Sequence, residues 1–232
     1  MKAFVTTLTG AALALGLTSA DSGLGQEGPA GPFGAASVRF EQNATDGDVE
    51  VVFEVRGRAD GLAWLTITAP DGRTVVHTSS PEASTLGMRQ FQMESPEPPD
   101  PSVVKAAYPE GVYAIAGGTM AGDSLRSEVT LSHRLPPPVT VVDPEDEAED
   151  VPTTGLHVSW APVDGVVAYR VTIEDEETGD AFTVSLGGSA RGLTVPDGFL
   201  KPGTEYQLAI GTVARNGNAS FVENGFTTAE GG

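Results

Sequence analysis

The side chains best suited to chemistry in this sequence are three histidines, His77, His133 and His157, and their spacing does not suit a shared task. A metal site built on one element usually needs two histidines only a few residues apart. These intervals are far longer, so we interpret all three histidines as surface residues. The chain has no cysteine, which excludes thiolate ligands, thiol nucleophiles and disulfides.

Two hydrolytic chemistries use residues that are abundant here, serine and the carboxylates. A serine nucleophile needs a base, an orienting acid and an oxyanion hole, and the sequence contains no Gly-x-Ser-x-Gly motif. A glycosidase needs two carboxylates held across a cleft. The 32 acidic residues make carboxylate pairs unavoidable, but small β-sandwiches offer little cleft. We therefore predict that the protein is not an enzyme.

One local segment is unusual: residues 143–150 carry a carboxylate at six of eight positions. Hard cations such as Ca²⁺ take clustered oxygen ligands, so the segment is a candidate calcium site. Its candidate ligands are Asp143, Glu145, Asp146 and Glu147. The alternative is a solvated acidic loop, which is the usual behaviour of a run of like charges. No other cofactor is predicted.

The charge balance limits the partners. The chain has 13 basic and 32 acidic residues, which gives a formal net charge of −19. A phosphate backbone and an anionic membrane both repel such a surface. We predict no nucleic-acid partner.

The first twenty residues indicate a secretory signal peptide. Lys2 is followed by an apolar run up to Leu17, and small residues up to Ala20 precede a cleavage position. The apolar run is short for a bilayer, and no later segment approaches that length, so no membrane span is predicted after cleavage. We predict an exported protein, periplasmic or extracellular. An exported chain without cysteine further indicates a bacterial source.

Beyond residue 36 the hydrophobic pattern alternates with the period of a β-strand. The clearest case is segment 49–56, in which four inward residues alternate with four outward residues. Segment 86–93 is also predicted as a strand, and segment 102–108 as either a helical turn or a short edge strand. In segment 49–56 the predicted inward residues are Val49, Val51, Phe53 and Val55, and the outward ones are Glu50, Val52, Glu54 and Arg56.

The spacing of strands and turns predicts an all-β fold with two tandem β-sandwiches. A flexible Gly/Pro-rich tail is predicted at residues 21–35, and the first sandwich at 36–133. Residues 134–138 contain three consecutive prolines and are predicted to be a semi-rigid linker. The second sandwich is predicted at 139–229.

Three segments of the second sandwich carry a family resemblance: Leu156–Trp160, Tyr169–Val171 and Leu200–Tyr206. Over residues 139–229 the sequence resembles a fibronectin type III domain. The resemblance implies that Trp160, Tyr169 and Leu200 pack in the core. It also implies a corner at Pro202 and Gly203, where the Tyr206 hydroxyl caps nearby backbone. The first sandwich resembles a diverged immunoglobulin-like domain, because residues 60–67 echo residues 164–171.

These observations predict a non-catalytic exported binding or spacer protein that contacts an unidentified protein or glycan. Two alternatives remain at this point. One is an accessory module or diverged relative of a secreted polysaccharide-active enzyme, which the family resemblance alone implies. The other is a surface spacer that calcium makes rigid.

Overall fold

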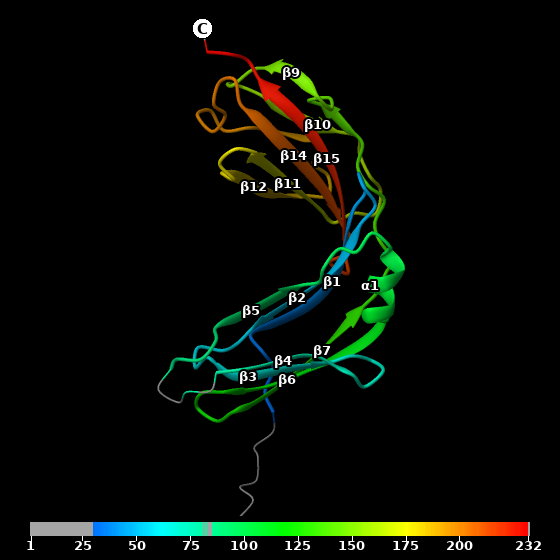
Figure 1. The fold of residues 1–232 in the computed structure, drawn as a ribbon, viewed down its shortest axis with the longest axis vertical. Helices are drawn as coiled ribbons and strands as arrows, with labels where there is room; N and C mark the ends of the chain where they lie inside the picture. The colour runs from blue at the N-terminus through cyan, green and yellow to red at the C-terminus, as the bar shows by residue number, and fades with distance from the viewer. Residues whose placement is uncertain (1–29, 81, 83–84, 232) are drawn as a thin grey trace, which may run out of the picture.

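The computed structural model describes residues 30–80, 82 and 85–231, and it is built almost entirely from β-strands (Figure 1). The all-β prediction is confirmed. The predicted signal peptide and most of the predicted tail lie outside the described residues. Within the described part, no helix has the length and apolar character needed to cross a membrane.

The N-terminal half is a sandwich of two antiparallel layers. Strands β4, β3, β6 and β7 form one layer, and β1, β2 and β5 form the other. Large side chains such as Phe40, Phe53, Leu65 and Tyr113 fill the space between the layers. The elements are β1 (Ala35–Asn43), β2 (Val49–Arg56), β3 (Leu62–Thr68), β4 (Thr74–Ser79), β5 (Gln90–Glu94), α1 (Pro101–Ala107), β6 (Gly111–Thr119) and β7 (Ser124–Leu131).

The C-terminal half is a second sandwich with its own core. A layer of β13, β10 and β8 faces a layer of β12, β11, β14 and β15. Trp160 is 3% exposed and packs against Tyr169, with 5.2 Å between the ring centroids. The elements are β8 (Val141–Asp143), β9 (Ala148–Val151), β10 (His157–Trp160), β11 (Ala168–Asp175), β12 (Ala181–Gly187), β13 (Gly192–Thr194), β14 (Glu205–Val213) and β15 (Ala219–Thr228).

The two sandwiches share one continuous sheet. Strand β1 of the first pairs in parallel with β15 of the second, so the strand order runs β12-β11-β14-β15-β1-β2-β5. The pairing aligns Glu41 with Ala219 and Asn43 with Phe221. In Figure 1 this sheet follows the concave side of a curved molecule. Sequence alone indicated a proline-rich connection but not this shared sheet.

The alternation in β2 explains how one strand serves a core and a polar face. The four residues predicted to point inward are all buried. Val52, predicted to point outward, is also fully buried. It lies directly opposite Arg39 and Glu94 on the neighbouring strands. Long charged side chains at such positions cover apolar surface with their aliphatic stems, which accounts for the burial of an outward valine.

One predicted segment takes the first of its two alternatives, and another is shorter than predicted. Segment 102–108 lies largely in helix α1, which starts at Pro101, and the Asp100 side chain accepts the Ser102 N–H. The strand predicted at 86–93 begins only at Gln90, and Leu86 is exposed. Within that segment Met88 forms an isolated β-bridge with Leu62, and this bridge does not extend into a ladder.

Each sandwich has a buried tyrosine whose hydroxyl bonds to backbone a few residues earlier. The Tyr206 hydroxyl accepts the Lys201 N–H at 2.9 Å, and the Tyr113 hydroxyl donates to the Pro109 carbonyl at 3.0 Å. Gly203 takes a φ of +60° at the corner, where a side chain would be strained. Both halves therefore fix a turn by the same kind of contact.

Replacing Tyr206 with Phe is expected to lower the free energy of unfolding by about 1 kcal/mol, because the Lys201 N–H loses its acceptor while the ring packing stays. Urea unfolding followed by tryptophan fluorescence and circular dichroism measures the change. Tyr108→Phe is the control, because the Tyr108 hydroxyl makes no hydrogen bond to the described residues. Equal stability of Tyr206→Phe and the wild type would show that the corner bond contributes nothing.

Candidate functional site

The histidines form no catalytic arrangement with the described residues. Each ring makes one hydrogen bond, and none of these ring bonds goes to a carboxylate; the Glu110 carboxylate accepts the backbone N–H of His133 instead. Without an acid to orient it, a histidine lacks one partner of a nucleophile-activating triad. The ring of His77 contacts the Thr66 hydroxyl, that of His133 the Tyr108 carbonyl, and that of His157 the Thr194 hydroxyl.

The acidic run 143–150 is attached to the edge of β15. Asp143 ends β8, and Glu145, Asp146 and Glu147 lie in the turn before β9. The Asp146 carboxylate accepts the Gly225 N–H at 2.9 Å, so this candidate ligand already has a backbone partner. The described residues contain no group of three or more His, Cys, Asp or Glu side chains arranged to hold a metal ion. The calcium site stays a prediction without geometric support.

Several buried polar contacts gather at the junction of the two sandwiches. Residues 134–138, the predicted linker, are bound to the C-terminal sheet by two buried hydroxyl groups. The Ser220 hydroxyl donates to the Pro136 carbonyl, and the Thr212 hydroxyl donates to the Pro137 carbonyl, each at 2.8 Å. Both hydroxyl residues are fully buried. The linker is therefore part of the packed structure.

Asn218 connects three segments with one side chain. It lies just after the β14–β15 turn and is 1% exposed. Its Nδ2 donates to the carbonyls of Ser132 at 2.7 Å and Arg134 at 3.0 Å. Its Oδ1 accepts the Phe40 N–H of β1 at 2.9 Å. A buried amide that satisfies three backbone groups fixes their relative positions.

An ion pair crosses the junction on the concave face. Glu41 of β1 is nearly buried and forms an ion pair with Arg39 on its own strand. Its carboxylate also lies 3.6 Å from the guanidinium of Arg170 on β11. Arg170 in turn lies over the Phe221 ring, 5.7 Å from its centroid. Glu41 therefore forms ion pairs with arginines from both sandwiches.

Because Gly211 has no side chain, it leaves space for the contact between Arg170 and the Phe221 ring. It lies between Arg170 and Phe221 in the strand register. A Cβ atom at position 211 would come within 2.4 Å of the Phe221 ring. Glycine in a strand interior often marks such a close approach, so Gly211 is the sequence signal for this contact.

A groove of about 350 Å³ opens on the concave face beside this ion pair. Six carboxylates line it, five from the N-terminal sandwich and one from β15. Burial, followed by the charges of neighbouring carboxylates, raises the pKa of Glu50 to about 7. The lining carboxylates are those of Glu41, Asp46, Asp48, Glu50, Glu97 and Glu223.

A second groove, of about 480 Å³, lies where the linker meets two turns of the C-terminal sandwich. Arg134 and Arg215 line it together with Leu135 and Pro136. Neither arginine forms an ion pair with the described residues. Two unpaired guanidinium groups beside apolar surface are features common in protein contact sites.

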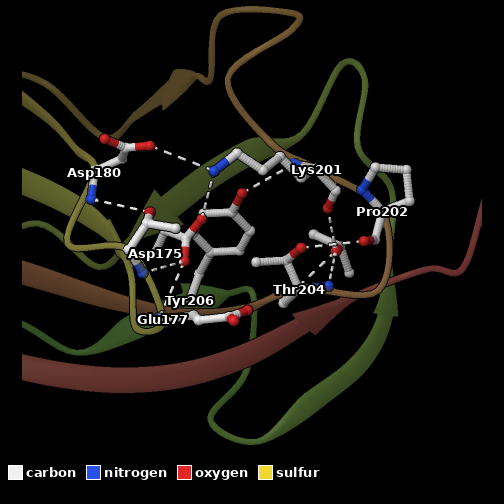
Figure 2. Close-up of polar contacts among 9 residues, drawn as sticks. Asp175, Glu177, Asp180, Lys201, Pro202, Thr204 and Tyr206 are labelled. Atoms are coloured by element: carbon white, nitrogen blue, oxygen red, sulfur yellow. Dashed lines mark hydrogen bonds and ion pairs between the residues drawn. The ribbon is translucent and has the colours of Figure 1, made fainter.

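A third polar cluster holds the C-terminal corner and is drawn in Figure 2. The Asp175 side chain is 2% exposed and lies 2.8 Å from the Lys201 ammonium. Its other oxygen accepts the N–H groups of Glu177 and Thr178. The Lys201 hydrogen bond, followed by these N–H donors, lowers the pKa of Asp175 to about 2. The cluster ties the β11–β12 turn to the corner, which is a structural role.

No protein-family model matches the chain. No curated protein matches it in sequence. Among solved structures, it is similar to the FN1–FN3 domains of chicken CNTN1, with 15% identity and a TM-score of 0.35. That match covers 87% of this chain and 65% of the CNTN1 chain, so this chain spans less than two thirds of that segment.

Two further solved structures are similar to this chain. A two-domain fibronectin type III segment of chicken tenascin is 16% identical, covers 84% of this chain and 98% of its own, and has a TM-score of 0.33. The fibronectin(III)-like modules of Clostridium thermocellum CbhA are 11% identical, cover 87% and 92%, and have a TM-score of 0.34.

The lowered pKa of Asp175 gives a prediction for acid stability. The ionised form is stabilised in the folded state, so its contribution is present above the ordinary pKa of 3.8 and is lost as the pH falls through about 2. Replacing Asp175 with Asn is expected to flatten the loss of stability over this acid range. Urea midpoints measured at several pH values down to 2 test this.

Asp180→Asn is the matched control for that measurement, because Asp180 is exposed and lies 3.4 Å from the same ammonium. We expect it to keep the wild-type acid dependence. If the midpoints of Asp175→Asn fall in parallel with those of the wild type, Asp175 is not the group that titrates.

Proposed function

We propose that this chain is a non-catalytic, exported binding or spacer protein that holds two sandwiches in one orientation. Surfaces on both sandwiches would then contact a protein or glycan partner together. Export remains part of the proposal and depends on residues 1–20. The observation that carries the proposal is the parallel pairing of β1 with β15, which makes one sheet from both sandwiches.

Tandem domains joined only by a linker are expected to move relative to each other. Here three kinds of contact oppose that motion: the strand pairing, the Asn218 amide and the buried hydroxyls that hold the linker prolines. The strand pairing and the Asn218 contacts are satisfied only when the two sandwiches lie as observed, and the hydroxyls hold the linker against the C-terminal sandwich. A fixed relative orientation is the property that a spacer or a two-surface binding protein needs.

The surface chemistry supports a partner that is not an anionic polymer. A net charge of −19 repels nucleic acids and other polyanions. The groove at Arg134 and Arg215 is a local exception, where two guanidinium groups that form no ion pair with the described residues adjoin apolar surface and Asp164. Within this proposal, it is the first surface to examine for a protein contact.

Replacing Asn218 with Ala is expected to release the two sandwiches from their fixed orientation. The change leaves three backbone groups without partners, which costs at least about 2 kcal/mol in the docked state. Small-angle X-ray scattering of the full chain is expected to fit one curved shape for the wild type and a mixture of orientations for Asn218→Ala. Circular dichroism shows whether the variant keeps its strands.

Gln207→Ala is the control, because Gln207 is an exposed amide on β14. Should Asn218→Ala fail to fold, Ser220→Ala removes one linker contact at smaller cost. Wild-type scattering that requires many orientations would overturn the fixed-orientation proposal. The binding role is tested by a glycan array and by pull-down from an exported-protein fraction. If neither retains a ligand, only the spacer role remains.

A further inference from the structure

The acidic groove lies at the β1–β15 pairing, where the two sandwiches meet. Its walls come from β1, the β1–β2 turn, β2, the loop after β5, and β15. Glu223 is its carboxylate from the C-terminal sandwich. The Asn43 amide donates to Glu223 at 2.9 Å, and the Thr45 hydroxyl accepts the Glu223 N–H. The charge state of this groove therefore acts directly on the junction.

Glu50 occupies the critical position on the N-terminal wall. In the β1–β2 register it lies directly opposite Glu41. Side chains at directly opposed positions on one face approach each other closely, and like charges there are destabilising. Glu41 is also the residue that pairs with Arg170 across the junction. An ionised Glu50 thus repels the carboxylate that holds the interdomain ion pair.

The groups that face Glu50 supply little positive charge to offset the repulsion between carboxylates. Every neighbouring element contributes acids, and only Arg39 opposes them. Arg39 is already shared, because its guanidinium pairs with both Glu41 and Glu54. The acids whose charges act on Glu50 are Glu41 on β1, Glu94 on β5 and Glu97 in the following loop. The groove that Glu50 lines is also lined by Asp46 and Asp48 in the turn and by Glu223 on β15.

We propose that Glu50 is a proton-controlled switch for the junction. In its neutral form the sandwiches stay docked through Glu41 and Arg170. In its ionised form, repulsion inside the groove loosens the docking and widens the range of angles between the sandwiches. The inference rests on the proposed fixed orientation and adds a condition under which that orientation is released.

The direction of the pH response follows from the titration. Burial and like charges raise the pKa of Glu50 from 4.5 to about 7. The folded state therefore takes up a proton that the unfolded state does not hold between these values, and this stabilisation is lost as the pH rises through about 7. Glu50 is therefore mostly neutral at pH 6 and mostly ionised at pH 8.

Distance measurement between two spin labels tests the switch on the full chain. Because the chain has no cysteine, Thr74→Cys on β4 and Ser185→Cys on β12 place one label on each sandwich, both at exposed positions. With EDTA present, the distance distribution of the labelled protein is expected to be narrow at pH 6 and to broaden at pH 8. Adding Glu50→Gln is expected to keep it narrow at both pH values.

Glu128→Gln is the matched control, because Glu128 is an exposed carboxylate on β7 outside the groove, and we expect it to keep the wild-type pH response. A distribution that is equally narrow at both pH values overturns the switch and leaves the fixed orientation intact. A distribution that is broad at both overturns the fixed orientation and the switch together. Broadening that persists in Glu50→Gln also overturns the switch, because another group then titrates.

Discussion

The parallel pairing of β1 with β15 is the contact on which the rest of this structure depends. Without it, β1 and β15 would each present unpaired backbone groups at the edge of a sheet, and such edges invite association with other chains. Pairing residues 41–43 with residues 219–221 covers that part of both edges and makes one sheet from two sandwiches. The curvature, the grooves and the interdomain ion pair all follow from this shared sheet.

A proline linker limits how such a junction can be satisfied. Proline has a carbonyl acceptor but no N–H donor. When prolines pack against a sheet, their buried carbonyls therefore need hydrogen-bond donors from other residues. Ser220 and Thr212 supply them from hydroxyl groups. Asn218 supplies two further donors to the chain before the prolines and accepts a hydrogen bond from β1. The three polar side chains are buried because the linker requires donors there.

Sequence patterns predicted the local parts of this fold and missed the junction. Alternation identified β2, and turn residues marked its neighbours, because both signals depend on residues close in sequence. Val52 was placed on the outward face, but its burial depends on Arg39, in a different strand. Likewise, Asn218 contacts residues 84 and 178 positions away. No period or short motif encodes such distant partners.

The crowded carboxylates follow from the same shared sheet. An acidic chain keeps its like charges apart most easily on a convex surface, where solvent screens each of them. The concave sheet instead brings acids from several elements into one groove, with Glu50 half-buried among them. Local conflicts of this kind are expected at functional positions, because a sequence selected for stability alone would remove them. A single amide in place of Glu50 would relieve the repulsion without disturbing the strand, so the carboxylate at this position is the feature that stability does not explain.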